Sequence, residues 1–335
     1  MMFLSQKITL TDQTSTGEAR RAVQHLAEKL GIDEIATEEA AIIVTEAARN
    51  AVVHGGGGEL LLSGTSQSQR KWLDIVALDK GPGIPDLPSA MRDGFSTRST
   101  PGTGLGAIRR LATVSDIFSN STGTAVFARV GDSRDRHLTM DVAGFAIPVA
   151  GENVCGDAIA WVETRERLAV ILADGLGHGP RAAEASDEAV ETFQAHSSLP
   201  PGQILARVHD ALRKTRGAAV AIAEVRPMSG TITYAGVGNI SGIVMSEGKL
   251  GRNLVSHNGT AGHIVPRIQE FTTEWPRDGR LVMFSDGLLS KWSLSTYPGL
   301  VNRPAAIIAA ILLRDFRRGR DDSSVFVLQH AGAEP

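Results

Sequence analysis

The chain has 335 residues and a formal net charge of −3, with charges of both signs interspersed. This length suits two domains, each with its own core, and the charge pattern offers no basic footprint for nucleic acid. The single cysteine, Cys155, excludes an internal disulfide framework and fits a reducing cytosol. Apolar runs fall short of the roughly 20 residues that span a bilayer, and the start lacks signal-peptide features. We expect a cytoplasmic protein that binds neither nucleic acid nor membrane.

In chain order, helical spacing predicts helices over residues 16–30 and 33–54, and four glycines at 55–58 stop the second. The other elements expected in this half are strands at 60–65, 72–78, 115–119 and 124–130 and a helix at 105–112. They predict an α/β sandwich over residues 1–131. Residues 132–137 are polar and charged with no apolar period, so we expect a linker there.

The remainder, residues 138–335, alternates between many strands and a few helices. Strands are expected at 138–149, 158–163, 168–173, 218–225, 231–235, 240–246, 281–285 and 324–328, and helices at 182–195, 202–214 and 304–314. Many strands around a helical pair predict a sheet sandwich flanked by helices. The whole chain is therefore of the α/β (α+β) class.

Three polar residues, Glu46, Asn50 and His54, stand four residues apart and share one face of the second helix. The amide oxygen of Asn50 can coordinate a magnesium ion beside triphosphate oxygens and waters. Glu46, one turn earlier, can act as general base on a water or a substrate hydroxyl. The alternative is a solvated polar stripe, and His54 either faces a ligand or simply ends the helix.

Two glycine-rich segments follow. Asp79 ends an apolar strand and leads into Gly81-Pro82-Gly83, a tight turn that lets a ligand approach closely, and a buried aspartate there can accept a hydrogen bond from the amino group of adenine. Gly102-Thr103-Gly104-Leu105-Gly106 places backbone N–H groups just before a helix, where an anion is favoured. Its spacing matches neither a dinucleotide-binding fingerprint nor a P-loop.

In this order the three segments resemble the N, G1 and G2 boxes of the GHKL ATPase superfamily. "EAARNAVVHGGGG" and "STPGTGLGAIRRLA" are similar to its anti-sigma-factor serine kinases, especially the RsbT-type kinases of the bacterial stressosome. The resemblance covers residues 9–130 and implies a Bergerat-type α/β sandwich that binds ATP with Mg²⁺. It implies Glu46 as base, Asn50 as magnesium ligand, Asp79 on adenine beside Gly81 and Gly83, Thr124 in support of Asp79, and Gly102, Gly104, Leu105 and Gly106 around the phosphates. It also implies a lid at residues 86–101, with Arg98 as a phosphate contact.

The second half carries aspartates at strand ends. Asp174, Asp286 and Asp321 stand where an apolar strand meets a loop, and Asp157 begins its strand. Carboxylates about 4 Å apart repel by roughly 4 kcal/mol per pair at an effective dielectric near 20, so gathering them at one rim requires cations. Oxygen ligands select magnesium or manganese, and two such ions can activate water for phosphate-ester hydrolysis. The alternative is that each aspartate merely caps a turn.

The segments "GDAIAW", "LADGLGHGPRAAEAS", "YAGVGNISG", "FSDGL" and "DDSSVFVL" resemble the metal-dependent type 2C phosphatases. More narrowly, they are similar to the SpoIIE-type branch and its RsbX-like members, over residues 138–329. The resemblance implies two Mn²⁺ or Mg²⁺ ions held by Asp157, Asp174, the Gly175 carbonyl, Asp286 and Asp321. Asp322 is the alternative to Asp321, because neighbours on a strand point oppositely and only one should face the metal.

The general acid stays open. The phosphatase family often has a histidine directly after Asp-Gly, whereas Leu176 stands there in this chain. His178 is then either the acid or a phosphate contact, or else a plain loop residue. Cys155 is expected to be a small buried residue rather than a nucleophile, since it has no assignable histidine base.

Taken together, the halves predict a bifunctional switch enzyme that phosphorylates serine or threonine on a regulatory protein and removes phosphate from the same or a related one. By resemblance the partner is a STAS-domain antagonist or stressosome-like scaffold in a pathway that controls a sigma factor, and related proteins of both kinds often form homodimers. Two alternatives are a phosphatase gated by ATP without kinase activity and a non-enzymatic adaptor that sequesters a sigma factor.

Overall fold

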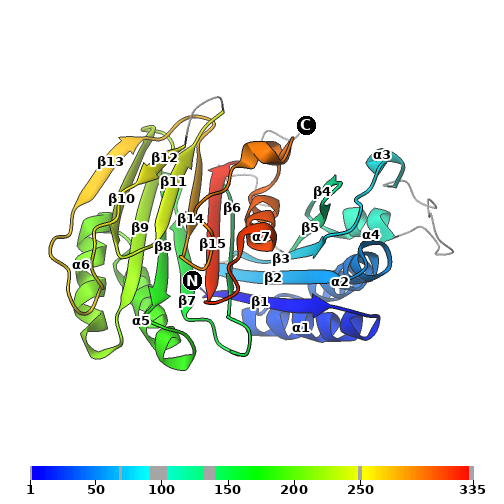
Figure 1. The fold of residues 1–335 in the computed structure, drawn as a ribbon, viewed down its shortest axis with the longest axis horizontal. Helices are drawn as coiled ribbons and strands as arrows, with labels where there is room; N and C mark the ends of the chain where they lie inside the picture. The colour runs from blue at the N-terminus through cyan, green and yellow to red at the C-terminus, as the bar shows by residue number, and fades with distance from the viewer. Residues whose placement is uncertain (1, 68–69, 91–103, 132–139, 248–250, 332–335) are drawn as a thin grey trace. The chain divides into compact units, whose positions relative to one another are not determined.

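The computed structural model describes residues 2–67, 70–90, 104–131, 140–247 and 251–331. The chain divides into two compact units (Figure 1). The amino-terminal unit comprises Met2–Leu138 together with Ser293–Arg314, and the carboxy-terminal unit comprises Met1, Thr139–Trp292 and Asp315–Pro335. The expected division into residues 1–131, 132–137 and 138–335 places residues 293–314 in the second domain. In the structure they cluster with the amino-terminal unit instead. The expected linker lies outside the described residues.

Among the described residues, the strands of the amino-terminal unit form a five-stranded antiparallel sheet in the order β1-β2-β3-β5-β4. The strands are β1 (Met2–Leu10), β2 (Gly58–Gln67), β3 (Arg70–Asp79), β4 (Val114–Asn120) and β5 (Gly123–Gly131). Four of them were expected, whereas β1 was not. It pairs with β2 along its whole length, from Met2 opposite Ser66 to Leu10 opposite Gly58.

Two long helices, α1 (Thr14–Leu30) and α2 (Glu34–Gly55), cover one face of this sheet (Figure 1). The carboxylate of Asp33 caps α2 by accepting the Ala36 N–H at 2.9 Å. Gly56 ends the helix in the left-handed conformation, with φ 75°, as the glycine run predicted. Two shorter helices, α3 (Leu87–Ala90) and α4 (Gly104–Leu111), follow β3 in the chain. The apolar face of α2 is thereby fixed on the sheet core, which sets the direction of its polar face.

The later segment of this unit contains η2 (Leu294–Thr296), η3 (Leu300–Asn302) and the helix α7 (Ala305–Phe316). Every residue of α7 from Ala305 to Arg314 is buried, as its apolar composition on all sides predicts. Two arginines tie the segment to the sheet. Arg303 Nη1 lies 3.0 Å from Asp116 Oδ1 on β4, and Arg314 Nη1 donates to the Asp79 carbonyl at 3.1 Å.

The strands described in the carboxy-terminal unit form two five-stranded antiparallel sheets, ordered β13-β10-β9-β8-β7 and β12-β11-β14-β15-β6. The first contains β7 (Asp157–Glu163), β8 (Leu168–Gly175), β9 (Ala218–Arg226), β10 (Thr231–Val237) and β13 (Glu270–Glu274). The second contains β6 (Met140–Ile147), β11 (Ser241–Met245), β12 (Arg252–Leu254), β14 (Arg280–Phe284) and β15 (Ser323–His330). Strands β12 and β13 were not expected.

The two sheets face each other, and Trp161 of β7 meets Phe326 of β15 with ring centroids 5.6 Å apart. Helices α5 (Pro180–His196) and α6 (Pro201–Ala211), followed by η1 (Leu212–Lys214), cover the outer face of the first sheet (Figure 1). This is the expected sandwich flanked by helices. Its strand ends converge at rims, so side chains far apart in sequence can meet there.

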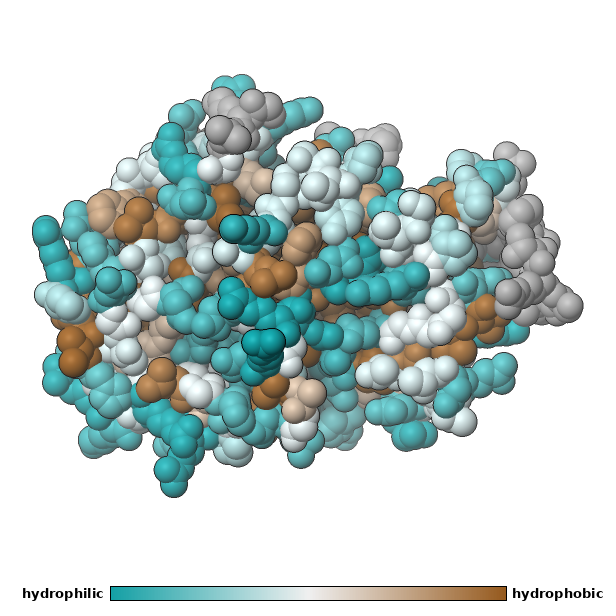
Figure 2. Space-filling view, viewed as in Figure 1, coloured by the Kyte–Doolittle hydropathy of each residue, from teal (hydrophilic) through white to brown (hydrophobic). Residues whose placement is uncertain are grey.

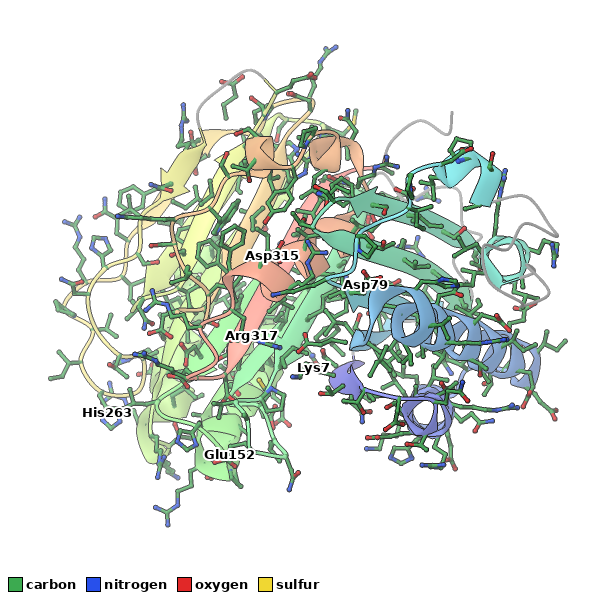
Figure 3. All side chains as sticks on the ribbon, turned by 45° about the vertical axis from the view of Figure 1, so that its right-hand side comes forward. Lys7, Asp79, Glu152, His263, Asp315 and Arg317 are labelled. Carbon is green, nitrogen blue, oxygen red and sulfur yellow. The ribbon has the colours of Figure 1, made fainter. Side chains whose placement is uncertain are left out.

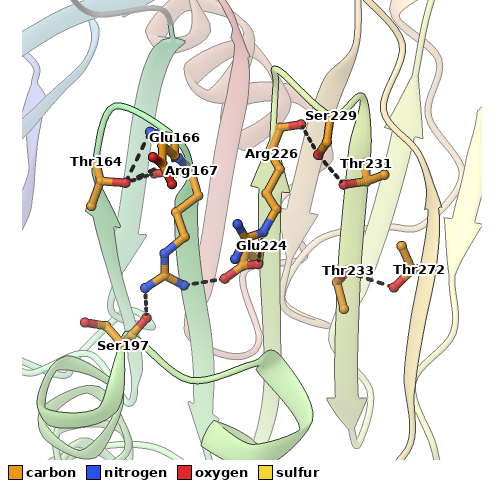
Figure 4. A network of polar contacts seen from close by, with 10 residues as sticks. All are labelled: Thr164, Glu166, Arg167, Ser197, Glu224, Arg226, Ser229, Thr231, Thr233 and Thr272. Atoms are coloured by element: carbon orange, nitrogen blue, oxygen red, sulfur yellow. Dashed lines mark hydrogen bonds and ion pairs between the residues drawn. The ribbon is translucent and has the colours of Figure 1, made fainter.

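One rim of the first sheet is closed by ion pairs (Figure 4). Arg167, in the turn from β7 to β8, bonds to the Glu224 carboxylate on β9 and to the Ser197 carbonyl after α5. Arg226 Nε donates to the other oxygen of Glu224 at 2.7 Å. Two arginines thus share one carboxylate at this rim. The opposite rim, where β7 begins and β8 ends, carries aspartates.

Hydrophilic and hydrophobic residues are interspersed over the face in Figure 2, in keeping with the mixed-sign charge of the sequence. In the part of the chain that the structure describes, no helix combines the length and apolar character needed to cross a membrane.

Candidate functional site

The polar face of α2 meets the start of α4 at a glycine. A Cβ atom added to Gly104 would lie 2.8 Å from Glu46 Oε2 and 3.4 Å from Asn50 Nδ2. Glu46 and Asn50 are both half-buried, so they are not part of a fully solvated stripe. The structure therefore brings together two of the predicted segments, and only a residue without a side chain leaves room for a ligand between them.

Asp79 stands at the end of β3, beside the end of α2 (Figure 3). Its Oδ1 accepts two backbone N–H groups, from Gly81 at 2.8 Å and from Thr124 at 3.1 Å. Gly55 is needed here, since its Cβ would come within 2.4 Å of the Asp79 Cβ. Among the described residues, both backbone donors go to Oδ1, which leaves Oδ2 to accept from a ligand. Thr124 supports Asp79 through its backbone, as expected.

The electrostatic surroundings of Asp79 are mixed. Burial raises the pKa of its carboxyl, while the two backbone N–H groups and the positive charges of Arg314 and His54 act to lower it. His54 itself is exposed. It stands in the last turn of α2, and its two readings, a ligand-facing residue or a helix end, stay predictions.

The turn after Asp79 is also closely packed. Gly83 has φ 79°, and a Cβ there would lie 2.1 Å from the Asn120 carbonyl. Ser119 Oγ joins this turn to the last strand, accepting the Ile84 N–H at 2.8 Å and lying 3.0 Å from Thr124 Oγ1. Leu105 and Gly106 lie in the first turn of α4, behind Gly104. Gly102, Arg98 and most of the predicted lid lie outside the described residues.

These donors and acceptors fit a nucleoside triphosphate. A carboxylate oxygen is available at one end, at Asp79, and an amide, a carboxylate and the N-terminus of α4 stand at the other. Backbone N–H groups at a helix start suit phosphate oxygens, and an amide oxygen suits magnesium.

In the carboxy-terminal unit, the start of β7 and the end of β8 bring two aspartates face to face. Asp157 pairs directly with Asp174 in the antiparallel ladder. Asp157 is only 4% exposed, and its Oδ2 accepts the Ser285 hydroxyl at 2.6 Å. Asp286 follows that serine, and its Oδ2 accepts from Asn239 Nδ2 at 2.7 Å. Three of the predicted metal ligands thus come from adjoining strand ends.

Two aspartates of this rim have carboxyl pKa values raised above the ordinary value, because they are buried close to one another. Burial, followed by the charge of Asp157 and then of Asp286, Asp321 and Asp322, raises the pKa of Asp174 to about 9. Burial raises the pKa of Asp157 to about 7, against the hydrogen bond from Ser285. Clustered carboxylates of this kind favour a proton or a cation.

Close backbone packing fixes the loops at this rim. A Cβ on Gly175 would lie 2.0 Å from the Ala182 carbonyl, and one on Gly287 would lie 1.9 Å from the Asp322 carbonyl. Within the described ranges, no three His, Cys, Asp or Glu side chains already stand as a metal-holding group. The oxygen donors have the chemistry for magnesium or manganese, so they fit those ions once the side chains turn inward.

The neighbours Asp321 and Asp322 have different surroundings. Asp322 is 3% exposed, and its two oxygens accept the Val149 N–H at 2.7 Å and the Gly156 N–H at 2.6 Å. Asp321 is half-buried, and its Oδ1 accepts the Asp322 N–H at 2.9 Å. Asp322 is therefore occupied in holding the 149–156 loop, which favours Asp321 as the ligand.

His178 lies on the loop between β8 and α5, with 57% of its side chain exposed. Its Nδ1 is 2.7 Å from Glu152 Oε1. This contact holds the imidazole through one nitrogen and leaves Nε2 for a ligand. Cys155 is half-buried, and burial raises the pKa of its thiol, so the thiol stays protonated as expected of a residue that is no nucleophile.

Sequence reasoning missed three residues that border these sites, namely Glu152, Asn239 and Arg314. Glu152 stands in the "GEN" segment just before the first aspartate motif, and Asn239 follows a glycine within "GVGNISG". A polar residue beside a recognised motif could have pointed to these two. Nothing local marks Arg314, because it meets Asp79 across 235 residues of chain.

Comparison with known families also divides the chain into two parts, but residues 293–314, which cluster with the amino-terminal unit, fall within the second match. The family model for the histidine kinase-like ATPase domain matches residues 9–130, and the model for stage II sporulation protein E (SpoIIE) matches residues 164–330. The SpoIIE match begins after Asp157 and includes the other predicted ligands of the acidic rim.

Two relatives come from Bacillus subtilis (strain 168). The serine/threonine-protein kinase RsbT is 36% identical over 93 residues, which are 28% of this chain and 70% of RsbT. The phosphoserine phosphatase RsbX is 25% identical over 138 residues, which are 41% of this chain and 69% of RsbX.

Two solved structures share the fold over 57% of the chain. One, from work on the bacterial stressosome as a modular system adapted to control secondary messenger signaling, has a TM-score of 0.54 at 24% identity and is covered to 99%. The other, RsbX in complex with magnesium, has a TM-score of 0.50 at 20% identity and is covered to 96%. The chain thus belongs to the histidine kinase-like ATPase family in its RsbT-like amino-terminal part, and a type 2C phosphatase domain of the SpoIIE kind follows.

Proposed function

We propose that this chain is a bifunctional switch enzyme, a serine/threonine kinase joined to a metal-dependent phosphoserine or phosphothreonine phosphatase. The observation that carries the proposal is that one chain holds both Glu46 with Asn50 against Gly104 and the facing pair of Asp157 and Asp174. A protein that only bound nucleotide would have no use for a base at Glu46. An adaptor that only sequestered a partner would have no use for the acidic rim.

In the kinase reaction, Asp79 Oδ2 accepts from the amino group of adenine while Gly81 and Thr124 hold its other oxygen. Asn50 would hold the magnesium ion, and Gly81, Gly83, Gly104, Leu105 and Gly106 give backbone access to the nucleotide. Glu46 takes the proton from the serine or threonine hydroxyl of the protein substrate. ATP with Mg²⁺ supplies the phosphoryl group when bound.

In the phosphatase reaction, two Mn²⁺ or Mg²⁺ ions would be held by Asp157, Asp174, the Gly175 carbonyl, Asp286 and Asp321. When bound they activate a water and neutralise charge on the phosphoryl group. Ser285 keeps Asp157 oriented, and Asn239 does the same for Asp286. His178, steadied by Glu152, donates a proton from Nε2 to the departing serine oxygen.

We infer the partner from similarity. RsbT and RsbX are named as kinase and phosphoserine phosphatase, and one similar fold was solved in work on the stressosome. A STAS-domain antagonist or scaffold protein of a partner-switching pathway is therefore the substrate to test first.

The test uses the full chain, ATP with magnesium, manganese and the STAS proteins of neighbouring genes. Glu46→Gln should keep ATP binding yet lower phosphotransfer by at least about 100-fold, the usual range for a lost general base. Asp174→Asn should abolish manganese-dependent release of phosphate and leave ATP binding intact. Phosphotransfer by Glu46→Gln at the original rate would remove the base role. If Asp174→Asn still released phosphate without metal, the acidic rim would not be the phosphatase site.

A second function, a phosphatase gated by ATP, is favoured by the position of Arg314. This residue lies in the SpoIIE-matched part of the sequence, yet it belongs to the amino-terminal unit and donates to the Asp79 carbonyl. Seven residues later the chain supplies Asp321. If gating holds, ATP should change the phosphatase rate of Glu46→Gln, in which phosphotransfer is slowed by at least about 100-fold. An unchanged phosphatase rate at saturating ATP would contradict gating and leave the bifunctional enzyme as the remaining proposal.

A further inference from the structure

One cationic side chain stands beside the acidic rim without a role in the functions above. The ladder between β8 and β9 reaches Gly175, which pairs with Ala218. One residue beyond the end of β8, the Leu176 N–H donates to the Gly217 carbonyl at 3.0 Å. Arg216 therefore emerges at the end of the sheet where Asp174 and Gly175 lie.

The guanidinium of Arg216 lies against the loop that follows these two residues. A Cβ added to Gly177 would be 3.3 Å from Arg216 Nη1, and Gly177 has φ 83°. The carbonyl of the same glycine would be 3.4 Å from a Cβ on Gly156, the residue before Asp157. The backbone of Gly177 thus lies between the first rim motif and the guanidinium, which stands where a side chain at this position would be.

The backbone that presents Arg216 is held on several sides. Its carbonyl accepts from His263 Nε2 at 2.8 Å, and the Gly217 N–H donates to Thr215 Oγ1 at 3.0 Å. Gly217 has φ 77° and packs so closely that a Cβ would lie 2.6 Å from the Ala261 carbonyl. Figure 3 shows His263 and Glu152 at the same end of the sandwich. A fixed backbone lowers the entropy cost of using this side chain for binding.

Three other arginines of this unit pair with carboxylates. At the opposite rim Arg167 and Arg226 share Glu224, and Arg213 Nε lies 3.2 Å from Asp210 Oδ1 (Figure 4 for the first two). Arg216 is exposed, and within the described ranges no carboxylate forms an ion pair with it. The guanidinium of Arg216 therefore offers N–H donors from a fixed backbone, next to the proposed site for phosphate esters.

We propose that Arg216 binds the phosphate group of the substrate, with its paired N–H groups on phosphate oxygens that point away from the metal ligands. The inference rests on the proposed phosphatase function and names the residue that orients its substrate. A planar guanidinium matches two phosphate oxygens at once, which an ammonium group does not.

The experiment compares Arg216→Ala, Arg216→Lys and the control Arg213→Ala in the full chain. Inorganic phosphate is titrated calorimetrically into the manganese-loaded protein, and p-nitrophenyl phosphate hydrolysis is measured alongside. Arg216→Ala should weaken phosphate binding by about 10- to 100-fold, the loss expected for charge-assisted hydrogen bonds. Arg216→Lys should lose about 3- to 10-fold because it keeps the charge without the fork. Arg213→Ala should match the unmodified chain, and Mn²⁺ affinity should be the same in all four proteins.

Phosphate affinity left unchanged by Arg216→Ala overturns the proposal. Equal weakening in Arg213→Ala also overturns it, since a general field effect would then be responsible. A loss of Mn²⁺ affinity in Arg216→Ala overturns it as well, by showing that the residue acts on the metal site. If Arg216 proves to bind phosphate but the unmodified chain hydrolyses no ester, the proposed phosphatase function fails while the phosphate site stands.

Discussion

Asp321 and Asp322 are adjacent, yet their surroundings differ. Strand alternation predicts that only one of them faces the metal, and it does not say which. The structure adds the missing information, because both oxygens of Asp322 accept backbone N–H groups of the 149–156 loop. A carboxylate already occupied by two donors is a poor choice for an ion.

The two residues should therefore respond differently to loss of charge. Asp321→Asn should weaken Mn²⁺ binding more than about 10-fold and leave the metal-free protein at least as stable, since it removes a like charge from the rim. Asp322→Asn should destabilise the metal-free protein by about 1–3 kcal/mol, the cost of leaving a buried donor unsatisfied. Mn²⁺ titration and urea unfolding with chelator measure both quantities. The reverse pattern would exchange the two roles.

The sequence predicts which residues lie near one another where their spacing along a helix or strand is enough to decide it. Glu46 and Asn50 share a helical face by periodicity, and Asp157 and Asp174 flank strands that sequence marks clearly. Prediction failed for Arg216 and Arg314, whose neighbours are set by strand register and by tertiary packing. Charged residues in loops and helices look alike in sequence until the fold places them.

At the scale of elements, the strands missed by sequence are those with weak patterns. Strand β1 was not among the expected elements, and β13 is an edge strand in which exposed residues alternate with half-buried ones. The helix α7 (Ala305–Phe316) was expected over residues 304–314 in the second domain; it falls within the SpoIIE match, while its residues up to Arg314 cluster with the amino-terminal unit. A helix that is apolar all round has no preferred face, so its sequence does not indicate which sheet it joins.

Because Arg314 of α7 contacts Asp79, we expect its substitution to affect nucleotide binding. Arg314→Gln removes the donor to the Asp79 carbonyl and a positive charge near its carboxylate, so ATP affinity should change by about 3- to 10-fold and any response of the phosphatase to ATP should be lost. Arg303→Gln breaks the pair with Asp116 and serves as the matched control. Calorimetric ATP titration and phosphatase assays with and without ATP measure the effect. An equal result for both variants would mean that α7 acts only through stability.

At the scale of the whole molecule, the acidic rim links stability to pH. Burial raises the folded-state pKa of Asp174 to about 9 and that of Asp157 to about 7, whereas in the unfolded chain both acids have a pKa near about 4. The metal-free folded state thus holds protons that the unfolded state releases. Its stability is fully present below the unfolded pKa and is lost as pH rises through the folded values.

With chelator present, the melting temperature of the carboxy-terminal unit should therefore fall between pH 5 and pH 9, by about 2–4 °C for each 1 kcal/mol lost. Saturating Mn²⁺ should remove most of this slope, because a cation favours the ionised carboxylates. Scanning calorimetry over the pH series measures it, and Asp174→Asn should show a shallower slope without metal. A melting temperature that rises with pH in chelator would contradict the burial of these groups.

The chain leaves the carboxy-terminal unit after Trp292 and returns at Asp315. One proteolytic nick between the halves would therefore not yield two self-sufficient pieces. The amino-terminal piece would lack the helix α7. The carboxy-terminal piece would expose to solvent the ten residues from Ala305 to Arg314, which are buried in the intact chain. Dissecting this protein by truncation invites precipitation, so its two chemistries are better separated by point substitution.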